Sequence, residues 1–470
     1  MKYISTRGQV DPIDFQDAVL MGLADDGGLL IPASIPDVSE HIETWREMDY
    51  RDLAFHVMKE FIDDIPPADF RAIVNKAYAD MNFEGGVAPT VEVGDLYICE
   101  LWHGPTLAFK DVALQLLGNL FEYILSERGG ELNILGATSG DTGSAAIYGV
   151  RGKARINIFI MHPDGRTSPI QARQMTTVLD DNVHNIAVDG SFDDCQALMK
   201  TLAGDLEFKR TYQLGAVNSV NWARVLAQIV YYFWASFRAG EQADKLDPKP
   251  VRFSVPTGNF GDILAGWYAM QMGAPISGLI LATNENDILS RFFNTGEYSV
   301  AEVVKTLSPS MDIQVASNFE RYLFYRLGSD HQKLREAMEL FKQTARLTVP
   351  LNEDGMVDRR ISAGRSTTED VLTIIRKYYE EHDYVLDPHS ACGVTVAEQM
   401  GLDGDTVVCL ATAHPAKFPD AIKDATGKDG LATHPEIEKL MDLPTRCEKL
   451  PNDIEQVRQF IVNRLKGNRE

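Results

Sequence analysis

The sequence predicts an α/β protein with a mostly parallel sheet, and three features predict it. Short apolar runs alternate with amphipathic helical segments from residue 93 onward. Two glycine-rich loops directly follow such runs and lead into helices. The chain has 470 residues, too many for one ordinary core. We therefore expect a mainly helical N-terminal segment over 1–92, an α/β domain over 93–240 and a second α/β domain over 241–470.

The elements are expected in a definite order along the chain. The helical N-terminal segment has loops at DDGG (25–28) and IPPAD (65–69), a charged linker follows at 239–250, and renewed helical pattern predicts an insertion at about 286–385. The expected strands are the apolar runs 96–102, 131–137, 156–162, 183–188, 251–256, 278–283 and 406–412.

Composition excludes several classes of function. The 68 acidic and 45 basic residues give a net charge of −23, which disfavours nucleic-acid binding. The most apolar run, 225–237, is shorter than the ~20 residues of a membrane span and predicts a buried helix. The N-terminus has no secretory pattern, and the five cysteines lack CxxC spacing. We expect a cytoplasmic protein without membrane, nucleic-acid or metal partners.

A lysine stands at an unusual place in the stretch 101–127. Apolar residues at helical spacing predict a helix that begins at Lys110 or Asp111. A cation in the first turn opposes the helix dipole and forgoes roughly 0.3–1 kcal/mol. A lysine that forms a Schiff base must lose its proton, and a helix N-terminus in a dry pocket favours this. The plain structural alternative is a solvated lysine.

The first glycine loop lies in NILGATSGDTGSAAIYGV, between a strand and a helix expected from Ser144. Exposed backbone N–H groups at a helix N-terminus bind anions, and Thr138, Ser139 and Thr142 add hydroxyl groups. A capped turn is the alternative. The loop is not GxSxG, so a nucleophilic serine is not indicated.

The second glycine loop, PTGNFG, joins strand 251–255 to a helix expected near Asp262. It matches neither GxGxxG nor a Walker A loop, yet the N–H groups of Asn259, Phe260 and Gly261 suit a single phosphate. A reactive lysine and a phosphate cradle are the minimum for pyridoxal phosphate. Thr412, at the end of strand 406–412, would offer the cofactor ring a hydroxyl group; it is otherwise an ordinary strand-end residue.

Six motifs follow one another along the chain: HGPTLAFKD, GATSGDTGSAAIYG, VNWARVLAQ, PTGNFGDILAG, DPHSACGV and ATAHPAKF. Together they resemble the long form of threonine synthase, found in many bacteria and in fungi. The resemblance extends from residue 3 to about 418 and implies a fold-type II pyridoxal phosphate enzyme, similar to the tryptophan synthase β chain. Trp102 and the SAC of 390–392 depart from the family pattern.

The resemblance assigns roles to individual residues. Lys110 would hold pyridoxal phosphate as a Schiff base and act as the base at the substrate Cα. Thr412 would meet the ring nitrogen, and His103 and His389 would line the site or simply pack. The cofactor phosphate would bind Gly258, Asn259, Phe260, Gly261 and Asp262. The substrate carboxylate would bind Thr138, Ser139, Gly140, Asp141 and Thr142. The substrate phosphate would bind Asn218, Asn221 and Arg224, for which helix-surface roles are the alternative.

The implied reaction converts O-phospho-L-homoserine and water to L-threonine and phosphate, in a monomer or small homo-oligomer. A phospholyase that forms 2-oxobutyrate from the same substrate is the nearest alternative. A threonine or serine dehydratase is less well supported, because its substrate needs no second phosphate site and Arg224 would then have no ligand to bind. A non-catalytic binding protein would not need an intact Lys110.

Overall fold

The structure is a computed structural model that describes residues 1–215, 217, 219–243, 249–402 and 404–467. The chain divides into two compact units. Unit 1 comprises Met1–Ala18, Leu23–Ala113 and Ser219–Thr433. Unit 2 comprises Val19–Gly22, Leu114–Asn218 and His434–Glu470. Among the described residues, no helix has the length and apolar character needed to cross a membrane.

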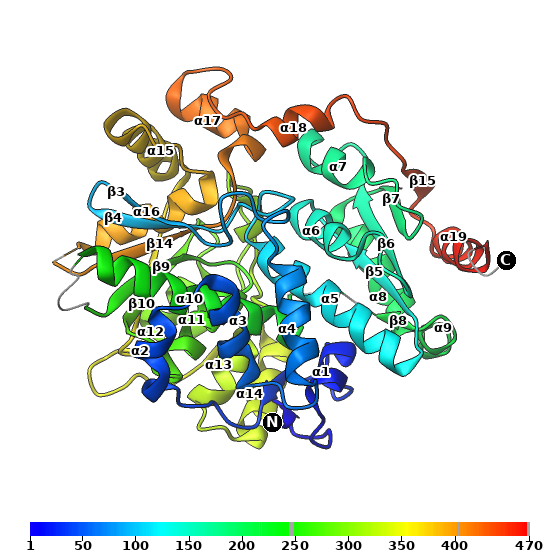
Figure 1. The fold of residues 1–470 in the computed structure, drawn as a ribbon, viewed down its shortest axis with the longest axis horizontal. Helices are drawn as coiled ribbons and strands as arrows, with labels where there is room; N and C mark the ends of the chain where they lie inside the picture. Colours follow the sequence, from blue (N-terminus) through cyan, green and yellow to red (C-terminus); the bar gives the residue numbers. More distant parts are fainter. Residues whose placement is uncertain (216, 218, 244–248, 403, 468–470) are drawn as a thin grey trace. The chain divides into compact units, whose positions relative to one another are not determined.

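Unit 1 contains a six-stranded sheet in the order β13-β10-β9-β14-β4-β3, in which only β3 runs antiparallel to its neighbour (Figure 1). The carboxyl ends of the parallel strands therefore meet at one edge, where ligands bind in such sheets. The strands are β3 (Thr90–Val93), β4 (Leu96–Glu100), β9 (Val251–Pro256), β10 (Ile276–Thr283), β13 (Ile361–Arg365) and β14 (Val407–Ala411).

Helices cover this sheet because the strands are apolar on both faces. Ile280 and Cys409 pack into a core with α15 (Thr368–His382) and α16 (Pro388–Met400). Phe253 faces the other way, with its ring 4.9 Å from that of Tyr232. Tyr232 lies on α10 (Trp222–Ala243), which is buried almost throughout, as expected for run 225–237. The other helices of unit 1 are α2 (Ile42–Arg46), α3 (Tyr50–Lys59), α4 (Pro67–Ala77), α11 (Gly261–Gln271), α12 (Ile288–Thr295), α13 (Phe319–Arg326), α14 (His331–Thr344) and α17 (Pro419–Thr426).

The helical pattern over 286–385 holds only in part. Helices α12, α13, α14 and α15 lie in this range, but β13 also lies there and joins the edge of the main sheet. β13 reads ISAGR, which is short, poor in large apolar residues and paired only with β10. Two short antiparallel pairs also occur in unit 1: β1 (Tyr3–Ser5) with β2 (Leu30–Pro32), and β11 (Glu297–Ser299) with β12 (Arg346–Thr348).

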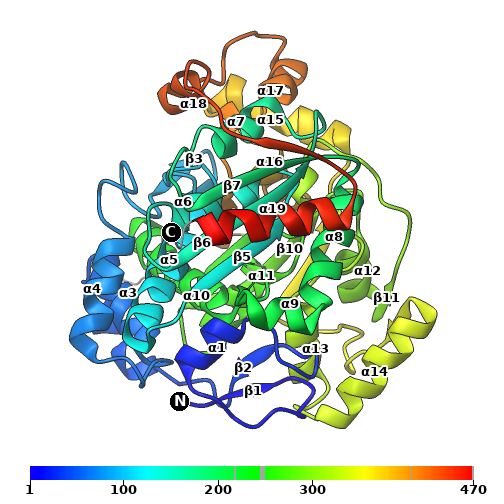
Figure 2. The ribbon, with the colours of Figure 1, turned by 90° about the vertical axis from the view of Figure 1, so that its right-hand side faces the viewer.

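Unit 2 contains a five-stranded parallel sheet in the order β15-β7-β6-β5-β8 (Figure 2). Helix α19 (Ile454–Gly467) packs its apolar residues against this sheet together with α8 (Phe192–Gly204) and α9 (Leu206–Thr211). The strands are β5 (Leu132–Ala137), β6 (Ile156–Pro163), β7 (Val183–Asp189), β8 (Leu214–Gly215) and β15 (Glu448–Pro451). The remaining helices are α6 (Asp141–Val150), α7 (Pro169–Thr176) and α18 (Pro435–Leu440).

Two helices contain residues of both units. Helix α1 (Phe15–Met21) and helix α5 (Lys110–Arg128) each have residues in both units. Within unit 2, α5 and α6 are in backbone contact: a Cβ on Gly118 would lie 1.9 Å from the Gly149 carbonyl oxygen. Only glycine permits this approach.

Candidate active site

Lys110 is the first residue of α5, as the sequence predicted. Its residue is 8% exposed, and its Nζ lies 5.0 Å from the centre of the Phe109 ring. The segment before it pairs with the segment that follows β14: Ala108 forms a bridge with Ala413, and the Phe109 N–H donates to the Thr412 carbonyl at 2.8 Å. The structure therefore brings Lys110 and Thr412 together at the carboxyl edge of the sheet.

Asp111 explains how the turn before Lys110 is held. It is fully buried, and its two carboxylate oxygens accept from the backbone N–H and the hydroxyl of Thr106 at 2.8 and 2.7 Å. Burial raises the pKa of Asp111 to about 6. Lys417 donates to the Thr106 carbonyl at 2.8 Å. A Cβ on Gly104 would lie 2.4 Å from the Cβ of Asp111, so the turn also requires this glycine.

Sequence reasoning missed this positioning group. Asp111 and Lys417 both stand in motifs that carried the family resemblance, but neither received a role. The signal available was two charged residues inside otherwise apolar surroundings. Charges in such places are rarely buried without a partner.

The second glycine loop runs from the end of β9 to α11, which begins at Gly261, one residue before the expected start. Phe260 precedes the helix in a left-handed conformation with φ 64°. Its buried ring stacks on Phe293 at 5.9 Å, which stabilises a conformation that a bulky residue rarely adopts. A Cβ on Gly258 would lie 2.8 Å from the Ser310 carbonyl oxygen. The loop therefore places close-packed backbone at a helix N-terminus, which fits a phosphate group.

The Asp262 carboxylate is engaged elsewhere. Its Oδ1 accepts from the hydroxyls of Tyr231 at 2.5 Å and Tyr232 at 2.9 Å. Its Oδ2 is buried and has no hydrogen-bond partner within the described part of the chain. Burial raises the pKa of Asp262 to about 6. The backbone N–H of Asp262, rather than its side chain, is the group that the phosphate interpretation needs.

Asp262→Asn should make the protein more stable above pH 6. The pKa of Asp262 is higher in the folded state than its ordinary 3.8, so the carboxyl contributes stability below about pH 4 that is lost as the pH rises through about 6. The variant should therefore exceed the wild type by about 2–3 kcal/mol in free energy of unfolding at pH 7. Below pH 4 the two should be equal. Denaturant unfolding at several pH values measures this difference.

The control for this prediction is Asp330→Asn. Asp330 is a half-buried cap of α14, and hydrogen bonds from the backbone N–H groups of Lys333 and Gln332 lower its pKa. Its replacement should reduce stability at pH 7, with the opposite sign. A loss of stability at pH 7 in Asp262→Asn would contradict the prediction.

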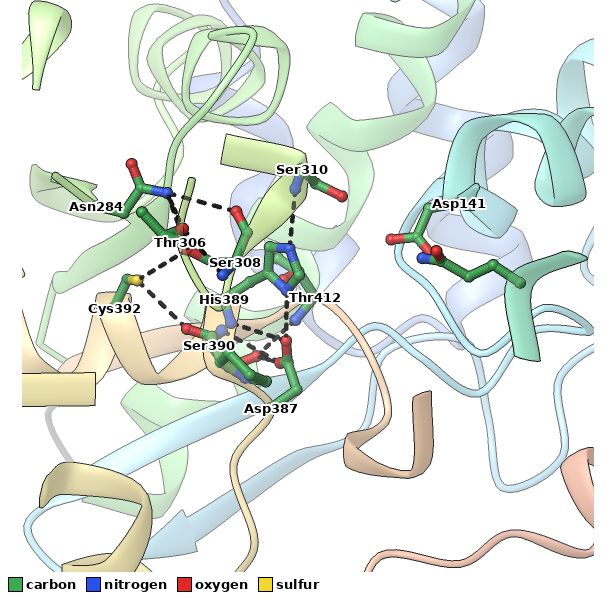
Figure 3. Close-up of polar contacts among 12 residues, drawn as sticks. Asp141, Asn284, Thr306, Ser308, Ser310, Asp387, His389, Ser390, Cys392 and Thr412 are labelled. Atoms are coloured by element: carbon green, nitrogen blue, oxygen red, sulfur yellow. Dashed lines mark hydrogen bonds and ion pairs between the residues drawn. The ribbon is translucent and has the colours of Figure 1, made fainter. Parts of the chain in front are cut away.

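Thr412 is fixed by a hydrogen-bonded group centred on Asp387 (Figure 3). The Thr412 N–H donates to the Ser390 Oγ at 3.0 Å, and the Ser390 hydroxyl donates to Asp387. The Nδ1 of His389 lies 2.9 Å from the other oxygen of Asp387, and its Nε2 accepts from the Ser310 N–H at 3.2 Å. Nε2 is an acceptor here, so Nδ1 carries the proton. His389 thus packs as a hydrogen-bonded residue.

Two residues that depart from the family pattern make defined contacts in this region. Ser390, the first residue of SAC, supplies the hydroxyl that links Thr412 to Asp387. Trp102 stacks on His103 with ring centres 4.0 Å apart. The ring nitrogens of His103 lie 2.9 Å from a Glu100 carboxylate oxygen and 2.8 Å from the Glu84 carbonyl. His103 is therefore held by protein groups at both nitrogens.

Arg224 lies in the first turn of α10 and is only 4% exposed. Its Nε and Nη1 have no hydrogen-bond partner among the residues that the structure describes. Burial lowers the pKa of Arg224 to about 10. Asn221 caps the same helix, with its side-chain oxygen accepting from the Ala223 N–H at 3.0 Å. A buried cation at a helix N-terminus is a site for an anion. The third predicted residue, Asn218, lies outside the described residues.

The first glycine loop belongs to unit 2, and some of its backbone N–H groups already donate hydrogen bonds within the loop. The Thr138 hydroxyl oxygen accepts from the N–H groups of Gly140 and Gly143, both at 3.0 Å. This capping lets α6 begin at Asp141, three residues before the expected Ser144. The buried Asp141 carboxylate accepts from the Gln171 side chain at 2.8 Å. Two of the loop's backbone N–H groups therefore donate to Thr138.

Comparisons with known proteins agree along the whole chain. Residues 2–78 match the family model "Threonine synthase N terminus", 86–351 match "Pyridoxal-phosphate dependent enzyme" and 390–461 match "Threonine synthase, C-terminal". The chain is 44% identical to threonine synthase of Pseudomonas aeruginosa, over 100% of this chain and 99% of the relative. It is 45% identical to that of Methylobacillus glycogenes, over 99% and 100%. A crystal structure of PLP-bound threonine synthase from Brucella melitensis superposes with a TM-score of 0.93 at 45% identity, covering 99% of both chains.

Proposed function

The chain belongs to the threonine synthase family of pyridoxal-phosphate-dependent enzymes, and on that premise we propose which of its residues carry the reaction. The expected fold-type II architecture and the expected cofactor are confirmed by these relatives. The chain is a lyase that forms L-threonine. Its substrate is a small molecule, which we propose to be O-phospho-L-homoserine.

The residues of unit 1 fit the cofactor. Lys110 would hold it covalently, Thr412 would offer its hydroxyl to the ring nitrogen, and the N–H groups of loop 258–262 would bind its phosphate. Support comes from the pairing of the Lys110 segment with Thr412 and from the close-packed loop at the N-terminus of α11. When bound, pyridoxal phosphate supplies an electron sink for negative charge at the substrate carbons.

Lys110 would also move protons. Its neutral Nζ would accept the proton from the substrate Cα. Lys110 is the first residue of α5 and is 8% exposed, so its amine lies in a largely buried place at a helix N-terminus. Asp111, Thr106 and Lys417 act through the turn before Lys110, and Ser390 and Asp387 act through Thr412. These are positioning residues.

Arg224 is the single observation that carries the choice of substrate. Its buried guanidinium has two nitrogens without a partner within the described residues, and a phosphate ester would supply acceptors for both. A substrate without phosphate would leave this charge unsatisfied. Asn221 would assist at the same helix terminus, and Asn218, outside the described residues, is proposed as a further ligand of the substrate phosphate. The loop residues Thr138, Ser139, Gly140, Asp141 and Thr142 would bind the substrate carboxylate.

Product identification tests the function. Purified, cofactor-loaded protein supplied with O-phospho-L-homoserine should form threonine and phosphate in equal amounts, as followed by NMR of the carbon products. Mainly 2-oxobutyrate would instead identify the phospholyase alternative, with the same cofactor and a different fate for the substrate. Absence of turnover would support a binding protein. Neither result is expected.

Location and assembly are further parts of the proposal. We propose a cytoplasmic protein that is a monomer or a small homo-oligomer. All five cysteines are free thiols, and four of them are buried, which suits a reducing compartment.

A further inference from the structure

One short segment hydrogen-bonds to both of the places that we assign to phosphate groups. Asn318, immediately before α13, is fully buried. Its Nδ2 donates to the Ser219 carbonyl at 3.0 Å and to the Asn259 carbonyl at 3.2 Å. Its backbone N–H donates to the same Asn259 carbonyl at 3.0 Å. One side-chain amide therefore joins the second glycine loop to the segment that leads into α10.

Ser317 contacts the same two residues through their side chains. Its hydroxyl lies 2.6 Å from the Ser219 hydroxyl and donates to the Asn259 Oδ1 at 3.2 Å. We call these two residues, 317–318, the Ser-Asn bridge. The bridge holds Asn259 by backbone and side chain together, so the loop and the segment before α10 keep a fixed separation.

Arg321 fixes the orientation of the Asn318 amide. Its Nη1 donates to the Asn318 Oδ1 at 2.5 Å, so the NH₂ end of the amide must face Ser219 and Asn259. The guanidinium also donates to the Val220 carbonyl at 2.5 Å and to the Leu30 carbonyl at 2.9 and 3.0 Å. A flipped amide would place its NH₂ group against a cation, which is unfavourable.

The two joined segments carry the two anion sites. Asn259 belongs to loop 258–262, which we assign to the cofactor phosphate. Ser219 directly precedes the segment with Asn221 and Arg224, which we assign to the substrate phosphate. A Cβ on Gly261 would lie 3.2 Å from the Asn318 Nδ2, so the bridge also touches the start of α11. Preformed donors bind an anion better than mobile ones because less ordering is required.

We propose that Asn318 is a positioning residue that couples cofactor-phosphate binding at loop 258–262 to substrate-phosphate binding at Arg224. The inference rests on the proposed function, which supplies the two sites. A phosphate that orders one segment orders Asn318, and Asn318 then orders the other segment, so each ligand improves the binding of the other. Through Asn318, the expected insertion at about 286–385 would help to position both phosphate sites.

The test replaces the donor while keeping the shape of the side chain. Asn318→Asp retains the oxygen that accepts from Arg321 but presents a second oxygen to two carbonyls. Titration of cofactor-free protein, followed by tryptophan fluorescence, should give a dissociation constant for pyridoxal phosphate that is about tenfold higher than in the wild type, the scale of one or two lost hydrogen bonds. The value for pyridoxal, which lacks the phosphate, should not change. An equal change for both, or no change, overturns the proposal.

A second measurement addresses the other site. Inorganic phosphate, titrated into cofactor-loaded protein, should bind Asn318→Asp about tenfold more weakly than the wild type. Wild-type affinity in Asn318→Asp overturns the bridge. Wild-type affinity in Arg224→Met overturns instead the assignment of the substrate phosphate, so the two failures are distinguishable.

Two controls keep the test decisive. Asn133→Asp alters another buried amide, which donates to the Tyr212 carbonyl at 2.6 Å and accepts from Asn157 at 2.8 Å within unit 2. It should lose stability without losing affinity for either phosphate. If the Asn318 variant does not fold, hydrogen exchange on the cofactor-loaded wild type decides: inorganic phosphate should slow exchange in 317–321, and unchanged exchange overturns the coupling.

Discussion

Lys110→Ala should lower the rate of threonine formation by at least about 10³-fold while the protein remains folded. The variant would lose both roles that we propose for Lys110, the covalent attachment of the cofactor and the base at the substrate Cα. The protein should remain folded, because the substitution truncates one side chain in the first turn of α5, where a cation opposes the helix dipole. Threonine formation by purified protein and the midpoint of thermal unfolding measure the two effects.

Lys153→Ala is the matched control. Its Nζ is also largely shielded, donating to the Asn119 oxygen at 2.7 Å and to the Glu122 carboxylate at 3.3 Å within unit 2. This variant should lose some stability and retain its activity. Threonine formation at the wild-type rate by Lys110→Ala would remove the proposed mechanism.

Arg224→Met should separate activity from stability. We expect kcat/KM for O-phospho-L-homoserine to fall by about 10²–10³-fold, because two charge-assisted hydrogen bonds to the substrate phosphate are lost. The free energy of unfolding without ligand should rise by about 1 kcal/mol or more, because a buried guanidinium with two nitrogens unpaired among the described residues is replaced by an apolar side chain of similar length. Steady-state kinetics and denaturant unfolding measure the two quantities.

The chain offers a matched arginine for this comparison. Arg321 is likewise buried, and burial likewise lowers its pKa to about 10, but its nitrogens donate to Leu30, Val220 and Asn318. Arg321→Met should therefore destabilise the protein by about 3 kcal/mol or more, since several buried acceptors lose their donor. Equal destabilisation in the two variants would show that Arg224 is a structural residue.

The sequence was informative where local pattern alone decides the structure. The start of α5 at Lys110 follows from apolar spacing after a Gly-Pro turn, and the start of α11 follows from a strand that ends in PTGNFG. The longer buried parallel strands, such as β9 and β10, are mainly apolar and coincide with predicted runs. The α/β class was therefore predictable.

The missed elements depend on contacts between distant segments. β13 and β15 lie at sheet edges and carry polar or small residues, so no apolar run marks them. The start of α6 was misplaced because the Thr138 side chain caps it from before the glycines. Asn318 received no role because its partners are far away in sequence: it donates to Ser219 across 99 positions. Asp387 bonds locally to His389 and Ser390, but its link to Thr412 runs through Ser390 across 22 positions.

The position of β14 in the main sheet has a consequence for how the protein is made. β14 lies between β4 and β9, so without it the sheet of unit 1 consists of two separate pieces, β3-β4 and β9-β10-β13. The contact between Lys417 and Thr106 spans 311 positions. The ribosome therefore synthesises Lys110 long before Lys417, which supports the turn in front of it, is available. Until the residues of β14 and Lys417 emerge, the proposed cofactor site cannot assemble, so its assembly must be a late event in biogenesis.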